Sequence, residues 1–209
     1  FQFVLWRWCG RMLIWWRLLW RINRLELQLV PTHPDLAGGI GGFGDAHMML
    51  APVGVGITTM LAATFAEEIR YGSVDVTHFL LPLTGAVCAI TLLVVVPLLI
   101  FSPRLIRVKQ RGLLEYATLA ARYVREFDEK WVRHNSPSRE PLLGSADIQS
   151  LADLANSFGV IRNMRFVPIA LSQVLLLVAA TALPATPLVL FVVPFDELIV
   201  KAAKALLNV

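Results

Sequence analysis

Charged side chains are scarce in this sequence, and one long stretch has none. Asp, Glu, Lys and Arg make up 16% of the 209 residues, against about 25% in an average soluble domain. Residues 79–101 contain no charged side chain at all. As a helix this stretch would be about 34 Å long, enough to cross a hydrocarbon core of about 30 Å. The scarcity of charge therefore predicts an all-α, polytopic helical membrane protein.

Cysteine is also scarce, and the usual catalytic motifs are missing. Cys9 and Cys88 are far apart in the sequence, and both lie in apolar surroundings. This excludes a disulfide framework and a CxxC metal or redox site. The G-x-S-x-G motif of serine hydrolases and the H-E-x-x-H motif of zinc proteases are absent too. The sequence thus indicates no cofactor and leans away from an enzyme.

Two further apolar stretches resemble membrane spans. Residues 48–66 form with residues 79–101 a predicted transmembrane hairpin (48–101), and their small side chains at four-residue spacing, Gly54, Thr58 and Ala62, predict close helix approach. Residues 166–183 form the third span, within a transmembrane segment of residues 166–193, and Pro184 and Pro187 are expected to break it.

The positive charges predict the sidedness of these spans. Lys and Arg outnumber Asp and Glu by 19 to 15, for a net charge of +4. The cations gather beside the apolar spans, where they usually set topology, so nucleic acid is not an expected partner. By the positive-inside rule residues 102–165 are cytoplasmic, and residues 67–78 face the other side.

Residues 1–24 combine arginine with tryptophan. At about 100° per residue, one side of a helix collects Leu5, Cys9, Met12, Trp16 and Leu19. The other side collects the arginines, which we expect to bind lipid headgroups: Arg7, Arg11, Arg17, Arg21 and Arg24. This pattern is typical of a helix lying in the membrane interface. The alternative is the end of a truncated span, in a chain that is longer at its N-terminus. Both place the arginines at the headgroups.

Residues 102–165 are predicted to form a small cytoplasmic helical subdomain. Residues 113–134 give an amphipathic helix whose apolar side is Leu113, Tyr116, Ala117, Ala120, Val124, Phe127 and Trp131. Ser145 is the expected N-cap of a second helix, whose apolar stripe is Ile148, Leu151, Ala152, Ala155 and Phe158. Its polar strip, Gln149, Asp153 and Asn156, is either a solvated face or a polar contact with a partner.

Residues 25–47 form a Gly/Pro-rich connector with two candidate motifs. Gly39, Gly41 and Gly44 spell G-x-G-x-x-G, but no βαβ unit surrounds them, so a flexible hinge is preferred to nucleotide binding. The prolines and glycines are expected to exclude a regular helix. A metal site is the second candidate, because the connector holds imidazole and carboxylate groups at His33, Asp35, Asp45 and His47.

Residues 194–209 are predicted to form an amphipathic C-terminal helix. Asp196 and Glu197 lie in its first turn. An unpaired acid at mid-bilayer costs about 2.5–3.5 kcal/mol on insertion scales, so a helix on the membrane surface is favoured over one that crosses back. Were the helix to cross, these two acids would be candidates to line a transport path.

The runs WRLLWRINRLELQLVPTHPDLAGGIGGFG and GSADIQSLADLANSF, with the closing proline-rich apolar segment, resemble a family of bacterial multi-pass membrane proteins. The resemblance covers nearly the whole chain. It implies a location in the bacterial inner membrane and assigns no activity, ligand or catalytic residue.

Three functions follow from these patterns. The preferred one is a non-enzymatic membrane component that binds anionic lipid and docks a membrane-protein partner or a second copy of the chain. The first alternative is a channel or transporter subunit, and the second is a metal-dependent membrane enzyme.

Overall fold

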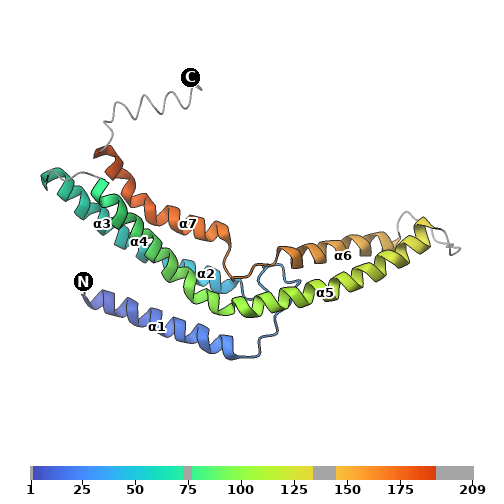
Figure 1. Ribbon diagram of the computed structural model, residues 1–209. Helices are drawn as coiled ribbons and strands as arrows, with labels where there is room; N and C mark the ends of the chain where they lie inside the picture. Colours follow the sequence, from blue (N-terminus) through green and yellow to red (C-terminus); the bar gives the residue numbers. More distant parts are fainter. Residues whose placement is uncertain (1, 73–76, 134–144, 192–209) are drawn as a thin grey trace, which may run out of the picture. The chain divides into compact units, whose positions relative to one another are not determined.

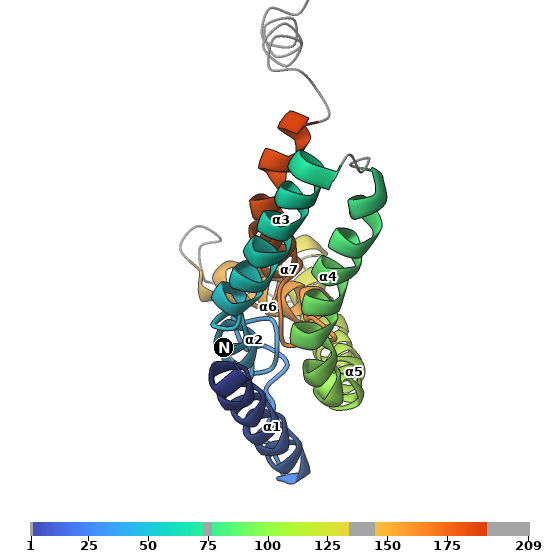
Figure 2. The same ribbon diagram turned by 90° about the vertical axis from the view of Figure 1, so that its left-hand side faces the viewer.

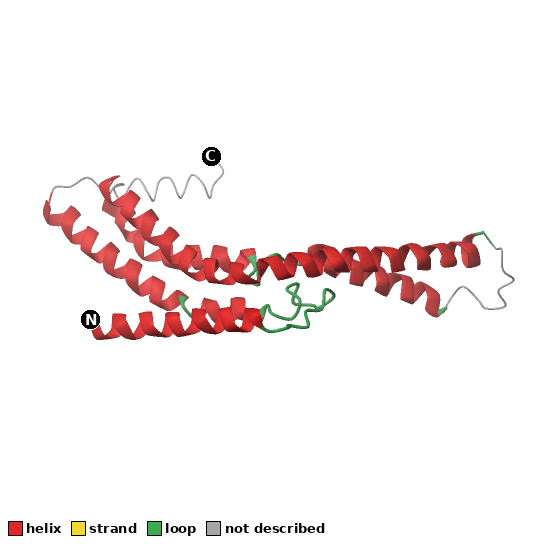
Figure 3. Cartoon of the chain, turned by 60° about the horizontal axis from the view of Figure 1, so that its bottom comes forward, coloured by secondary structure: helices red, strands yellow, loops and turns green. Residues whose placement is uncertain are grey.

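The structure is a computed structural model that describes residues 2–72, 77–133 and 145–191. Over these ranges the chain consists of helices joined by loops and contains no strand (Figures 1 and 3). The prediction of an all-α protein is confirmed. Within the described part, three helical runs are long and apolar enough to cross a membrane: Gly42–Tyr71, His78–Val132 and Leu171–Leu188.

The chain divides into two compact units, each built from two separate stretches of sequence. The first comprises the described parts of residues 1–44 and 97–169. The second comprises the described parts of residues 45–96 and 170–209. The apolar hairpin and the third span thus belong mainly to the second unit, and most of the basic residues belong to the first.

The second unit is a helical bundle. It contains most of α2 (Gly42–Met48), α3 (Ala51–Gly72), α4 (Thr77–Val95), α7 (Leu171–Ala182) and the 3-10 helix η3 (Leu183–Phe191). α3 packs against α4, α7 and η3, and α4 packs against α7 (Figure 2). The small residues Gly54, Thr58 and Ala62 are buried along α3. A Cβ atom on Gly54 would lie 2.7 Å from Ile90 Cγ2, so the predicted close helix approach is confirmed.

Threonine hydroxyls in this bundle bond to their own helices. Thr58 Oγ1 donates to the carbonyl of Gly54, Thr84 Oγ1 to that of Leu80, and Thr181 Oγ1 to that of Leu177. Such bonds satisfy a polar group without a partner from another helix. The threonines are therefore compatible with an apolar environment.

The first unit contains α1 (Gln2–Arg24), the loop 25–41, the end of the 3-10 helix η1 (Val96–Phe101), α5 (Ser102–Phe127), the π-helical turn η2 (Asp128–Val132) and α6 (Ala146–Asn163). α5 and α6 pack side by side as a helical hairpin (Figure 1). Leu105 and Ile161 are fully buried at its base, together with Phe101, and Met164 is almost fully buried.

Several predicted helix boundaries are wrong. The connector does contain a regular helix, because α2 begins at Gly42. The amphipathic helix begins at Ser102 instead of residue 113, since Pro103 lies in the first turn, where a helix needs no N–H from it. The third span begins at Leu171 instead of residue 166, and beyond Ala182 it continues as η3 instead of breaking at the two prolines.

The predicted faces of the hairpin are partly wrong. On α6 the side chains of Ile148, Ala152 and Ala155 are exposed, and the covered side instead carries Leu151, Leu154, Phe158 and Ile161. On α5, Ala117 and Val124 are exposed and Tyr123 is half-buried. Both helices carry apolar residues on more than one side, and the pairing of α5 with α6 determines which side is covered.

Candidate functional site

The surface of α1 divides into three sectors around the helix. A covered stripe at spacings of three and four residues contains the half-buried Trp8, Met12, Trp15 and Ile22 and the fully buried Leu19. All five arginines named above are exposed. Trp6, Leu13 and Trp20 are 73%, 63% and 43% exposed and form an apolar sector beside them, and Ile14 and Leu18, 71% and 43% exposed, lie among the arginines. On the side predicted to be apolar, Met12 and Trp16 are half-buried, Leu19 is buried and Cys9 is exposed.

Two arginines of α1 lie over tryptophan rings. The guanidinium of Arg24 is 3.5 Å from the centroid of Trp20, and that of Arg11 is 5.5 Å from the centroid of Trp8. Cation–π contact holds each guanidinium near its ring while leaving the edge N–H groups available. The arginine side of α1 is thus partly ordered before any ligand arrives.

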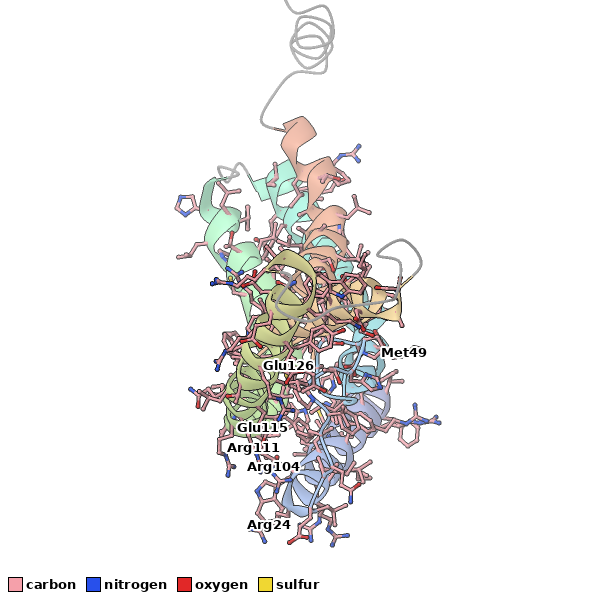
Figure 4. The ribbon with its side chains drawn as sticks, turned by 90° about the vertical axis from the view of Figure 1, so that its right-hand side faces the viewer. Arg24, Met49, Arg104, Arg111, Glu115 and Glu126 are labelled. Atoms are coloured by element: carbon pink, nitrogen blue, oxygen red, sulfur yellow. The ribbon has the colours of Figure 1, made fainter. Side chains whose placement is uncertain are left out.

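The C-terminal end of α1 meets the start of α5. Arg104 Nη1 donates a hydrogen bond to the carbonyl of Leu25, the residue that follows α1. Figure 4 shows Arg24 and Arg104 at this junction. Within the described part of the chain, neither guanidinium has a carboxylate partner. The junction is therefore a concentration of uncompensated positive charge.

Residues 25–41 of the connector form a hydrogen-bonded loop. The Asp35 carboxylate accepts hydrogen bonds from the amides of Ala37, Gly39 and Gly41 at 2.8–3.1 Å, and it lies 2.8 Å from His33 Nδ1. Burial by itself raises the pKa of Asp35, but the backbone hydrogen bonds, with help from His33, outweigh it and lower the pKa. Asp35 thus acts as an internal cap for the loop.

Backbone conformation and close packing explain why glycine occupies each of the three motif positions. Gly39 has a φ of +97°, which favours glycine. A Cβ atom on Gly41 would lie 3.0 Å from Asp35 Oδ2, and one on Gly44 would lie 2.2 Å from the carbonyl oxygen of Pro168. Close packing explains the spacing without a nucleotide.

The four candidate metal ligands divide between the two units. His33 and Asp35 contact each other in the first unit. In the second unit Asp45 accepts a hydrogen bond of 2.6 Å from Gln173 Nε2, and His47 is fully buried. Among the described residues, no group of three or more His, Cys, Asp or Glu side chains is arranged to hold a metal ion.

The polar strip of α6 is exposed. Gln149 Nε2 donates to Asp153 Oδ1 at 3.0 Å, and Asn156 is exposed one turn further on. The strip faces away from α5, because the covered side of α6 carries Leu151, Leu154 and Phe158. Asp196 and Glu197, the candidate transport acids, lie outside the described residues.

Two clusters of contacts were not predicted from the sequence. Asp147 Oδ2 accepts hydrogen bonds from Lys130 Nζ and Trp131 Nε1 at 2.8 and 3.0 Å, which lowers the pKa of Asp147. The wide turn of η2 lets both neighbours reach it. Ser145 is the N-cap residue as expected, but its side chain makes no capping bond.

The second unpredicted cluster joins the connector to the end of α6. Arg165 donates from its backbone N–H to the carbonyl of Leu36 at 2.7 Å, and its side chain donates to the carbonyl of Asp35. Lys109 Nζ donates to the carbonyl of Met164 at 2.7 Å. These partners are too far apart in sequence for spacing to reveal them.

The fold defines a class, a helical protein with three helices able to cross a membrane within its described residues. No family model matches the sequence, and neither a curated protein nor a solved structure matches it. The resemblance to bacterial inner-membrane proteins stays a prediction.

Proposed function

We propose that this chain is a non-enzymatic integral membrane component that crosses the bilayer with α3, α4 and α7 and binds anionic lipid headgroups through α1. The observation that carries the proposal is the surface of α1, on which exposed arginines adjoin an exposed apolar sector. A helix in the membrane interface needs both: an apolar side that enters the acyl region and cations at the phosphates.

The three sectors of α1 suit three environments. Trp8 and Met12 are half-buried and Leu19 is buried, so this stripe is the part of α1 least available to lipid. Trp6, Leu13 and Trp20 would enter the boundary between headgroups and acyl chains, the depth that tryptophan prefers. Arginine side chains can then extend to the phosphates, because their aliphatic stems tolerate apolar surroundings.

We further propose a bacterial inner-membrane location with residues 102–165 in the cytoplasm. The cations after residue 101 support this orientation, because cytoplasmic flanks are enriched in Lys and Arg. The exposed strip of Gln149, Asp153 and Asn156, with the exposed Ile148 beside it, would dock a membrane-protein partner or a second copy. No contact among the described residues gives comparable support to a transporter or a metal-dependent enzyme.

Lipid selectivity of the reconstituted chain tests the proposal. Spin-labelled phosphatidylglycerol and phosphatidylcholine report how strongly each lipid associates with the protein. Each basic residue near an anionic surface contributes about 1 kcal/mol, so Arg11→Gln/Arg17→Gln should reduce the preference for phosphatidylglycerol about tenfold or more. Added salt should weaken the preference as well.

The matched control removes two exposed arginines from the distal half of α5. Arg122→Gln/Arg125→Gln lowers the net charge equally but lies about 30 Å along α5 from its first residue, and it should leave the preference unchanged. Equal losses in both variants would show a general charge effect and contradict a lipid-binding role for α1.

A further inference from the structure

We infer that the junction between α1 and α5 is a specific site for an anionic lipid whose headgroup carries two phosphodiester groups. The inference rests on the proposed lipid-binding function and adds a place and a ligand class. The site lies entirely within the first unit and consists of two arginine pairs, Arg21 with Arg24 on α1 and Arg104 with Arg107 on α5.

Arg104 is fixed by a contact between distant parts of the sequence. Its Nη1 donates to the carbonyl of Leu25, 79 residues earlier in the chain, and its side chain is half-buried. This bond also satisfies a carbonyl at the end of α1, where the helix dipole is negative and would otherwise disfavour an anion. The remaining N–H groups of Arg104 can therefore bind a phosphate.

Arg24 is fixed by a different contact. Its guanidinium lies over the ring of Trp20 at 3.5 Å, which restrains the plane but leaves the N–H fork free for the two oxygens of a phosphodiester. Arg21 and Arg107 stand one helical turn from Arg24 and Arg104, and both are exposed. Arg107 Nε donates to the carbonyl of Pro103 in its own helix at 3.1 Å, which leaves its Nη groups for a ligand. Each helix thus has a pair of guanidiniums that could bind one phosphate.

The surroundings leave this charge available. Among the described residues, no carboxylate forms an ion pair with any of the four arginines. Further along α5 the charges do pair, since Arg111 Nε lies 2.7 Å from Glu115 Oε1 (Figure 4). An exposed acid, Glu26, lies two residues after Arg24, and the cations outnumber it four to one.

The position of the site indicates a lipid source for the phosphates. Arg104 is three residues beyond the uncharged run that ends at Phe101, so its Cα lies about 4.5 Å past the end of that run along a helix. This is the headgroup level of a bilayer whose hydrocarbon core the run fills. The four arginines, two on each helix, provide two guanidiniums for each of two linked phosphodiesters. Basic pockets at this level on the cytoplasmic side are known to hold such headgroups.

Cardiolipin is the probe that tests the inference, with phosphatidylglycerol as the single-phosphate comparison. The full chain, purified in a neutral detergent, is titrated with each lipid at equal phosphate concentration, and bound lipid per chain is counted by native mass spectrometry. We expect one cardiolipin to bind at least tenfold more tightly than phosphatidylglycerol. Arg24→Gln/Arg104→Gln should abolish that difference, and Arg122→Gln/Arg125→Gln should preserve it.

A second variant covers the case in which loss of the Arg104 hydrogen bond perturbs folding. Arg24→Lys/Arg104→Lys keeps the charge but removes both bidentate forks, and it should reduce the cardiolipin preference while retaining the helical circular dichroism signal. Retention of the full preference in either variant would overturn the inference. Binding of both lipids in proportion to their charge would overturn the inference but not the proposed function. Binding of neither lipid would overturn the proposed function as well.

Discussion

At the scale of single residues, the most informative side chain is Asp35. Its carboxylate accepts hydrogen bonds from three backbone amides and lies beside His33. One acid thus organises a loop that contains prolines and glycines. The sequence makes Asp35 a candidate metal ligand, because carboxylate and imidazole groups stand close together in the connector. Such groups also form turns, and only the folded loop shows that this carboxylate is already occupied.

We predict that Asp35→Asn destabilises the protein by about 1–2 kcal/mol near neutral pH, because hydrogen bonds to an ionised acceptor are lost. The pKa of Asp35 is lowered in the folded chain. Its stabilising contribution is therefore fully present above the ordinary value of 3.8 and is lost as the pH falls through the lower folded value. Thermal midpoints in detergent, compared between the two proteins, should converge as the pH drops below about 4.

The control for this measurement is Asp153→Asn, which changes an exposed carboxylate on α6. It should shift the thermal midpoint little at any pH in the same series. A constant difference between the Asp35→Asn variant and the unmodified chain at all pH values would contradict the assigned role of the Asp35 charge.

At the scale of helices, the sequence predicts that a helix exists better than it predicts the residues at which the helix ends or the side that is buried. The uncharged run 79–101 and the spacing of Gly54, Thr58 and Ala62 were enough to predict α4 with η1 and the buried side of α3. Periodicity could not decide which side of α6 is covered, because apolar residues occupy several sides. The start of α7 depends on a local contact, the Gln173 side chain that accepts from the Ala170 N–H.

Gly54 tests the packing of the second unit. A methyl group there would lie 2.7 Å from Ile90 Cγ2 and 3.1 Å from Thr181 Cγ2. We predict that Gly54→Ala lowers stability by about 1–3 kcal/mol, the usual cost of overpacking, as measured by the thermal midpoint in detergent. Gly56→Ala is the matched control, because nothing lies within 4 Å of a Cβ at Gly56.

The control should be neutral or slightly stabilising, since alanine favours a helix over glycine by about 1 kcal/mol. Adding Ile90→Ala to Gly54→Ala should restore part of the loss, because it removes the methyl group that the new side chain meets. Equal effects of Gly54→Ala and Gly56→Ala would show that α3 does not pack as described.

At the scale of the whole molecule, the chain divides its chemistry between two units. The second unit has apolar helices whose hydroxyls bond internally. The first unit gathers exposed arginines on α1 and at the start of α5. The scarcity of charge predicted the apolar helices, but not that α1 and the loop 25–41 belong to the same unit as α5 and α6. The junction of Leu25 with Arg104 was not predictable, because no periodicity links residues so far apart.

Cysteine accessibility in sealed vesicles tests the central claim, that the helices cross a bilayer, most directly. Single cysteines replace Arg70, near the end of α3, and Arg122, on α5, in a chain carrying Cys9→Ser and Cys88→Ser. A membrane-impermeant maleimide is added before or after the vesicles are opened. The account predicts that the two positions are labelled from opposite sides. Labelling of both from the same side would contradict it.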